Sequence, residues 1–249
     1  MKQEIKRFAN NALDIILPPR CVVSGEMVER QGMISAAAWG MLDFIDDPKC
    51  DKCGIPFGFD MQAIENAQGT YCALCLDDPP PFTIARAALS YNDQSRDLIL
   101  GFKHGDQMHN VLAFTPWLRR ASEDMLSRAD AIIPVPLHYL RLIKRRYNQA
   151  AVMAQHLGRQ AHVPVYVDAL RRVRATVTQG HLSRDERSRN VKHAFVVGEK
   201  FKTHIRGKSL ILIDDVYTTG ATVKECTKVL LKAGARDVFV LTLARVVRE

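Results

Sequence analysis

Four cysteines stand in two pairs whose spacing suits a metal ion. Cys50 and Cys53 form one Cys-x-x-Cys pair, Cys72 and Cys75 form a second, and residues 54–71 separate the two. Such pairs bring four thiolates into the tetrahedron that zinc prefers, as in a zinc ribbon. Four structural thiols without a metal are the alternative, but paired cysteines in a reducing compartment are usually metal ligands. The spacing therefore predicts one structural zinc ion per chain.

A second group of reactive residues lies near the C-terminus. Asp214 and Asp215 directly follow the aliphatic residues 210–213, and a polar loop comes next, made of Thr218, Thr219, Gly220, Ala221 and Thr222. Carboxylates accept from sugar hydroxyls, threonines add donors, and glycine lets the backbone approach a ligand. Any one of these residues could instead cap a helix or form a turn. The whole string predicts a site for a sugar phosphate.

The elements around this loop indicate one βαβ unit. The aliphatic run 210–213 does not alternate, which is typical of a parallel strand covered on both faces. Apolar residues then recur at helical spacing from Val223 to Ala233, Gly234 is placed to end that helix, and residues 238–243 read as the next strand. The loop thus lies at a helix N-terminus, where unpaired N–H groups and the helix dipole bind anions.

The string resembles the 5-phosphoribosyl 1-diphosphate (PRPP) motif of type I phosphoribosyltransferases. In that family two acids hold the ribose hydroxyls and the loop holds the 5′-phosphate. Further motifs resemble the ComF family, competence-associated proteins with a zinc-ribbon front end. These motifs are Pro-Val-Pro-Leu at 134–137, Arg-Arg-Tyr-Asn-Gln at 145–149, and the spaced residues Thr178, Gln179, Leu182, Arg187, Asn190 and Val191. The resemblance runs from about Pro18 to the C-terminus.

The resemblance implies an α/β fold, a mainly parallel sheet of the type I phosphoribosyltransferase kind after an N-terminal zinc ribbon. It also implies Mg²⁺ with PRPP as ligand, with Asp214 and Asp215 on the ribose. Lys103 and Arg145 are expected to act with the two acids in catalysis, and Val135 and Arg146 to bind PRPP. A lone lysine is more often solvated, and the basic group around Arg145 could be a solvated helix face or a nucleic-acid patch.

A second ribbon, which the family often carries upstream, is predicted to be degenerate. Cys21 remains, but Ser24, Ser35 and Ala38 occupy the other three positions. One thiol cannot hold zinc, so packing must replace the ion. The apolar residues available for this packing are Trp39, Leu42, Phe44 and Ile45.

The stiff stretch Asp-Asp-Pro-Pro-Pro at residues 77–81 predicts a domain boundary. We expect an N-terminal helix and zinc-ribbon domain over residues 1–78 and a phosphoribosyltransferase-like domain over residues 82–249. The first helix is expected around residues 5–15. Additional strands are expected at 85–91, 131–136 and 163–167, with helices around 111–117 and 148–157. No internal repeat is evident.

Charge favours polyanionic ligands without choosing among them. Lys and Arg number 35 against 27 Asp and Glu, giving a formal net charge of +8. Residues 171–192 are strongly cationic and poor in apolar side chains, which indicates a mobile active-site lid and makes single-stranded DNA a second candidate ligand. Rival nucleotide motifs are excluded: the sequence has no G-x-G-x-x-G, and Gly-Lys-Ser at 207–209 precedes its strand.

A cytoplasmic protein is predicted. The N-terminus lacks the apolar core of a signal peptide, and the longest mostly apolar segment, residues 33–42, is shorter than the ~18 residues that span a bilayer. Three functions stay open: a phosphoribosyltransferase with an unknown acceptor, a DNA-uptake factor that binds single strands with PRPP as ligand, and a PRPP sensor without turnover. The resemblance adds a competence helicase as a partner, and a dimer is left open.

Overall fold

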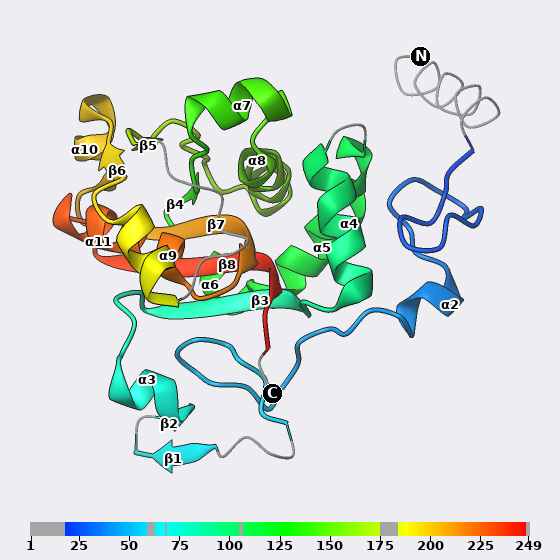
Figure 1. The fold of residues 1–249 in the computed structure, drawn as a ribbon, viewed down its shortest axis with the longest axis horizontal. Coiled ribbons are helices and arrows are strands. Elements are labelled where there is room, and N and C mark those ends of the chain that lie inside the picture. Colours follow the sequence, from blue (N-terminus) through cyan, green and yellow to red (C-terminus); the bar gives the residue numbers. More distant parts are fainter. Residues whose placement is uncertain (1–17, 59–62, 68, 105–106, 175–183, 248–249) are drawn as a thin grey trace.

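The computed structural model describes residues 18–58, 63–67, 69–104, 107–174 and 184–247 (Figure 1). The helix expected around residues 5–15 therefore lies outside the described residues. Within them, the central sheet has four parallel strands in the order β3-β8-β7-β4. Their bounds are β3 (Ile84–Ser90), β4 (Ala131–Pro134), β7 (Ser209–Tyr217) and β8 (Asp237–Arg245). The predicted α/β class with a parallel sheet is confirmed.

Helices cover both faces of this sheet, which explains the unbroken aliphatic run of β7. Ile211 and Ile213 point into one buried cluster, and Leu210 and Leu212 into another on the opposite face. One face packs against α5 (Val111–Ala121) and α8 (Gln149–Ala161), and the other against α11 (Ala221–Lys232). Because side chains on both faces of the sheet are buried here, residues 210–213 are apolar without alternation.

Shorter elements surround these layers (Figure 1). α4 (Asp93–His104) and the 3₁₀ turn η1 (Met108–Asn110) lead into α5, and α7 (Tyr139–Arg145) leads into α8. A small antiparallel pair, β5 (Leu170–Arg172) and β6 (Phe195–Val197), lies beside α11. The remaining elements are α6 (Glu123–Leu126), α9 (Arg184–Val191), η3 (Glu199–Phe201) and α10 (Lys202–Ile205).

Two small modules precede the sheet. The first contains α2 (Ala36–Trp39), and the second contains β1 (Ile64–Asn66), β2 (Gly69–Tyr71) and α3 (Ala73–Asp77). Cys21 and Ala38 of the first module join the buried cluster that includes α5 and α8. The four paired cysteines of the second join the cluster on the other face. The boundary proposed at residues 77–81 falls between α3 and β3 and stays a prediction.

The two modules, the predicted degenerate ribbon and the intact one, repeat one hydrogen-bonded loop. In each, a cysteine N–H bonds to a carbonyl five residues later, and a glycine with positive φ returns a bond to that cysteine's carbonyl. The first copy has Cys21 N to Glu26 O at 2.7 Å and Gly25 N to Cys21 O at 2.9 Å. The second has Cys50 N to Ile55 O and Gly54 N to Cys50 O, both at 2.8 Å. The expectation of no internal repeat is therefore corrected.

Other expectations are met only in part. The strand expected at 163–167 is reduced to a single bridge between Val165 and Ile132. The segment expected to be a lid contains β5 and α9, while residues 175–183 lie outside the described residues. No helix in the described part of the chain is long and apolar enough to cross a membrane.

Candidate functional site

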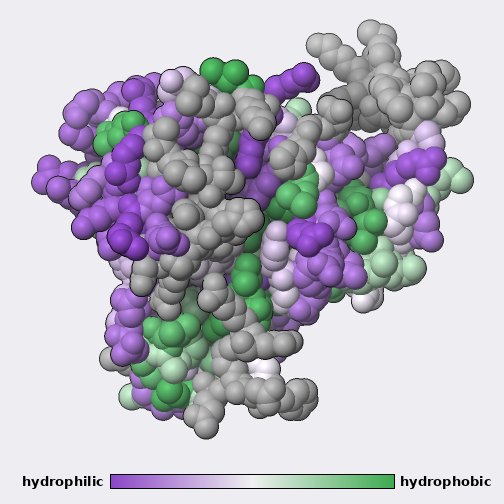
Figure 2. Space-filling view, viewed as in Figure 1, coloured by the Kyte–Doolittle hydropathy of each residue, from purple (hydrophilic) through white to green (hydrophobic). Residues whose placement is uncertain are grey.

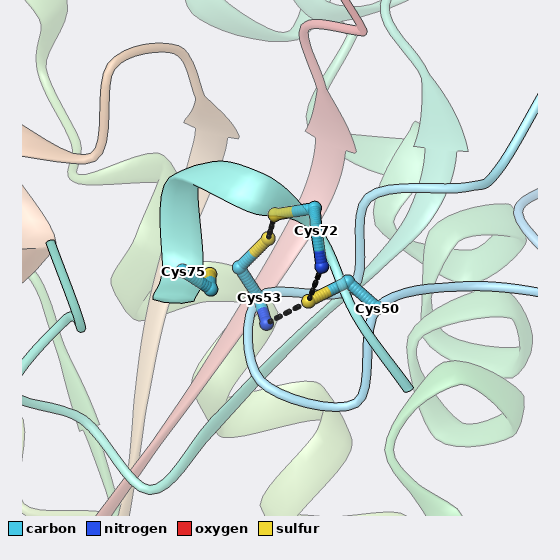
Figure 3. Close-up of side chains that lie close together, drawn as sticks. All are labelled: Cys50, Cys53, Cys72 and Cys75. Atoms are coloured by element: carbon cyan, nitrogen blue, oxygen red, sulfur yellow. Dashed lines mark hydrogen bonds between the residues drawn. The ribbon is translucent and has the colours of Figure 1, made fainter. Parts of the chain in front are cut away.

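The four paired cysteines converge on one point (Figure 3). Their sulfur atoms all lie within 4.8 Å of one another, and all four side chains are buried. Cys53 Sγ and Cys72 Sγ are 3.8 Å apart, which matches the tetrahedron edge expected for Zn–S bonds of about 2.3 Å. These four are the one group in the described residues whose donors could hold a metal ion. The donors fit a structural zinc.

A buried cation beside the cysteines supports this metal assignment. Arg245 is only 7% exposed, donates to the Cys53 carbonyl, and holds its Nη2 3.4 Å from Cys53 Sγ. Within the described residues Arg245 has no carboxylate partner, and a buried charge needs an opposite one nearby. A zinc ion with four thiolates carries a net charge of about −2, which supplies it.

The second candidate site is a cavity of about 310 Å³ at the carboxyl end of β7. This edge of a parallel sheet is where α/β proteins place ligands. Most of the residues expected from the sequence line the cavity: Lys103, Val135, Arg145, Asp214, Asp215, Thr218, Thr219, Gly220, Ala221 and Thr222. They come from α4, the segment after β4, α7, β7 and the start of α11.

Gly220 has a backbone role in this loop. Its φ of +75° is left-handed, and it stands at the N-cap position of α11 without any side-chain cap. A Cβ atom there would come within 2.4 Å of the Tyr217 hydroxyl. Glycine is therefore required both for the conformation and for space, and the turn brings the first N–H groups of α11 to the cavity.

The two acids differ in their surroundings. Asp215 Oδ2 lies 2.9 Å from Lys103 Nζ, and both side chains are largely buried. Asp214 accepts from the Asp215 N–H at 2.9 Å. Burial and then the neighbouring charge of Asp215 raise the pKa of Asp214 to about 7. Lys103 thus pairs directly with one acid, while the pKa of the other lies near neutral.

Several lining residues were not expected as site residues. Arg172, at the end of β5, adds a third cationic side chain beside Lys103 and Arg145. Asn148 and Gln149 also line the cavity and organise it. Asn148 Nδ2 donates to the Val135 carbonyl at 3.0 Å, and Gln149 Nε2 donates to the Lys103 carbonyl at 3.2 Å. The motif at 145–149 could have signalled both amides.

Arg146 is placed differently from its expected role. It is exposed, has a left-handed φ of +66°, and is not among the residues that line the cavity. Arg145, by contrast, faces Gln149, with Nη1 3.5 Å from Oε1. Of the two neighbouring arginines, only Arg145 reaches the cavity in this structure.

Comparison with known proteins gives the family. A family model described as "Double zinc ribbon domain" matches residues 12–76. Competence protein F of Haemophilus influenzae is 32% identical over 203 residues, covering 80% of this chain and 85% of the relative. DNA utilization protein YhgH of Escherichia coli (strain K12) is 32% identical over 205 residues, with the same coverage. The chain belongs to the ComF family of competence proteins, as its motifs indicated.

More distant similarities are weaker. Competence protein ComFC of Bacillus subtilis is 28% identical over 166 residues, 64% of this chain and 63% of the relative. Among solved structures, the chain is similar to orotate phosphoribosyltransferase from Aeropyrum pernix, at 17% identity over 64% of this chain and 68% of that one, with a TM-score of 0.35. A TM-score of this size carries no argument about function, which has to come from the site.

Proposed function

We propose that the chain binds PRPP together with Mg²⁺ in the 310 Å³ cavity. The observation that supports this is the convergence of two acids, a glycine turn at a helix N-terminus and three cationic side chains on one cavity. Asp214 and Asp215 would accept from the ribose hydroxyls, and residues 218–222 would hold the 5′-phosphate. Lys103, Arg145 and Arg172 would face the diphosphate.

The same residues suit phosphoribosyl transfer. In that reaction the C1–O bond breaks, its electron pair leaves with the diphosphate, and an acceptor nucleophile bonds to C1. Bound Mg²⁺ would neutralise part of the charge that develops on the diphosphate. Lys103 and Arg145 would stabilise the same charge by being held in place before the reaction, through their contacts with Asp215 and Gln149. The acceptor is left open.

Calorimetry with PRPP and Mg²⁺ tests binding. Asp214→Asn should weaken PRPP binding by at least tenfold, because a hydrogen bond to a charged acceptor contributes roughly 1.5–3 kcal/mol. Thermal melts without ligand separate a binding role from a structural one. Since the folded pKa of Asp214 is raised above the 3.8 of a free carboxyl, its ionisation destabilises the free protein as pH rises through about 7.

Asp214→Asn should therefore raise the melting temperature at pH 8, with no gain near pH 4. Asp215→Asn is the matched comparison, because it breaks the ion pair with Lys103 and should lower stability. A variant Asp214→Asn that binds PRPP like the parent, or melts much earlier at pH 8, contradicts the proposal. Diphosphate release from PRPP then distinguishes an enzyme from a sensor that only binds.

We infer single-stranded DNA as a second ligand, on a separate surface. A groove of about 700 Å³ beside β6 and α11 is lined by four lysines and two acids, Lys192, Lys202, Lys228, Lys232, Glu199 and Glu225. Figure 2 shows hydrophilic residues gathered over this region of α10, β6 and α11. Lys202 pairs with Glu199 at 2.6 Å, whereas the other three lysines have no ion pair among the described residues. The relatives' names, which refer to competence and DNA utilisation, favour this ligand.

A salt series tests the groove. Replacing Lys192, Lys228 and Lys232 together by glutamine should reduce the slope of log affinity against log salt by about 2, since each phosphate contact on a single strand contributes about 0.7. A control of equal charge change replaces three exposed arginines elsewhere, Arg30, Arg119 and Arg159. Equal slopes in the two triple variants would contradict a DNA groove at this surface.

A further inference from the structure

Arg245 lies between the cysteine cluster and the phosphate loop. It ends β8 and stands opposite Tyr217, which ends β7. Its guanidinium donates to the Cys53 carbonyl, approaches Cys53 Sγ at 3.4 Å, and lies 4.4 Å over the centre of the Tyr217 ring. One buried side chain therefore touches a metal ligand on one side and the last strand residue before the loop on the other.

Tyr217 continues this contact into the loop. It is 7% exposed, and its hydroxyl lies so close to Gly220 that no Cβ would fit between them. A cavity of about 110 Å³ marks the junction and is lined from both sides, by Cys53, Cys72, Cys75, Tyr217, Thr218, Thr219 and Arg245 among others. The Gly220 turn therefore rests on a ring that Arg245 and Phe82 also contact.

Negative charge at the cysteines would balance the buried charge of Arg245. Within the described residues it has no carboxylate partner, and its Nε is buried without a hydrogen bond. Metal-bound thiolates would supply the charge and hold the guanidinium against Cys53. Because the same guanidinium contacts Cys53 on one side and the Tyr217 ring on the other, a shift of the Cys53 loop on zinc loss would move both contacts.

We propose that Arg245 is a positioning residue that couples zinc occupancy of the cysteine site to the conformation of the phosphate loop. With zinc bound, the thiolates hold Arg245, Arg245 holds the Tyr217 ring, and the ring holds the Gly220 turn. Without zinc the turn loses this support. The identification of PRPP as the ligand of this loop rests on the proposed function. The coupling between zinc occupancy and loop order does not.

Hydrogen–deuterium exchange of the backbone amides tests loop order without any ligand. Chelating zinc from the parent should speed exchange across residues 218–223 by roughly tenfold, within the 5–150-fold range of coupled sites. In the zinc-loaded state, Arg245→Gln should already show fast exchange in this segment. Tyr217→Leu, which leaves the Arg245 contact with Cys53 intact, should do the same. Amides of α8 report whether the sheet stays folded in each protein.

Arg236→Gln is the matched control. Arg236 stands at the opposite end of β8, is exposed, and contacts Ser209 and Asp237 but neither the cysteines nor Tyr217. In this variant the amides of residues 218–223 should exchange at the same rate as in the parent. The proposal is overturned if zinc removal leaves the loop of the parent unchanged, or if zinc-loaded Arg245→Gln and Tyr217→Leu both exchange like Arg236→Gln.

A metal-side readout gives the reciprocal test. Arg245→Gln should lower zinc affinity by roughly 10–100-fold, the usual effect of losing a partner of a metal ligand. In protein loaded with cadmium, PRPP with Mg²⁺ should shift the cadmium NMR signal of the parent but not that of Tyr217→Leu. If calorimetry detects no PRPP binding, the proposed function fails and the exchange experiment still decides the coupling. If PRPP binds and the cadmium signal stays fixed, the coupling fails alone.

Discussion

The two N-terminal modules share a hydrogen-bonded loop but differ in the side chains that stabilise it. In the second, Cys50 Sγ accepts from the N–H groups of Cys53 at 3.5 Å and Cys72 at 3.4 Å (Figure 3). In the first, Cys21 Sγ accepts from the N–H groups at the matching positions, Ser24 at 3.4 Å and Ser35 at 3.3 Å. The loop around the first sulfur is thus kept although three of the four thiols are absent.

Two hydroxyls and a buried alanine occupy the positions in the first module that correspond to three thiols of the second. Ser24 Oγ and Ser35 Oγ are 3.1 Å apart, where the second module has two sulfurs at 3.8 Å. Ala38, at the fourth position, is fully buried against the core that includes α5. The comparison teaches that this loop needs either a metal or a packed apolar face, and that the hydrogen bonds to the first sulfur are common to both solutions.

The largest contrast should come from the matched first cysteines. Cys50→Ser should abolish zinc binding and unfold the second module, because structural zinc contributes roughly 10–16 kcal/mol to small zinc domains. Cys21→Ser should leave the metal content unchanged and lower stability near neutral pH by only about 1 kcal/mol, as expected for one buried hydrogen-bonded group. Metal analysis and thermal melts of both variants check this. A stoichiometry near two zinc ions in the parent, or one that falls in Cys21→Ser, would contradict the assignment.

Rebuilding the lost site should give the next largest effect. The triple variant Ser24→Cys, Ser35→Cys and Ala38→Cys restores four thiols on a loop with the hydrogen bonds of the intact one. It should bind a second zinc ion and melt at a higher temperature when zinc is present. The double variant that keeps Ala38 is the control, since three thiols leave one position to water. Zinc content that stays near one in the triple variant would show that packing of Ala38 has closed the site.

Whether a feature of the fold or the site could be predicted from the sequence depends on whether its pattern is local in the chain. Cysteine spacing gave the four ligands, and the aliphatic runs gave β7 and β8, because both patterns are local in the chain. The degenerate first ribbon was predicted from the family resemblance, but the hydrogen-bonded loop that it shares with the second was not, since only scattered residues are shared and the evidence is backbone hydrogen bonding. The roles of Arg172 and Arg245 were missed for another reason. Each lies far along the chain from the residues it meets, and only tertiary packing brings them together.

Cys21 should also make the stability of the protein depend on pH. Burial raises its pKa, but hydrogen bonds from the Ser24 side chain and from N–H groups outweigh burial and bring the pKa to about 7, from 9.0 for a free thiol. A lowered folded pKa stabilises the protein fully above the unfolded value and not at all below the folded one. The difference in unfolding free energy between the parent and Cys21→Ser should grow from pH 6 to pH 9, reaching at most ~2 kcal/mol. A flat difference would mean that Cys21 stays a neutral thiol.

The smallest predicted change in stability concerns the N-cap residues of α2 and α3. Ser35 caps α2 and accepts from the Ala38 N–H at 3.3 Å, whereas Cys72 stands at the same position of α3 without a side-chain cap. Ser35→Ala should therefore cost about 1 kcal/mol, the usual value of an N-cap. Ser24→Ala is the matched control, because it removes the same hydroxyl pair but no cap, and should cost at most about 0.5 kcal/mol. Urea denaturation of the zinc-loaded protein measures both. If the two variants lose equal stability, the hydrogen bonds among Ser24, Ser35 and Glu26 rather than the cap stabilise the first module, because both substitutions remove contacts within that group.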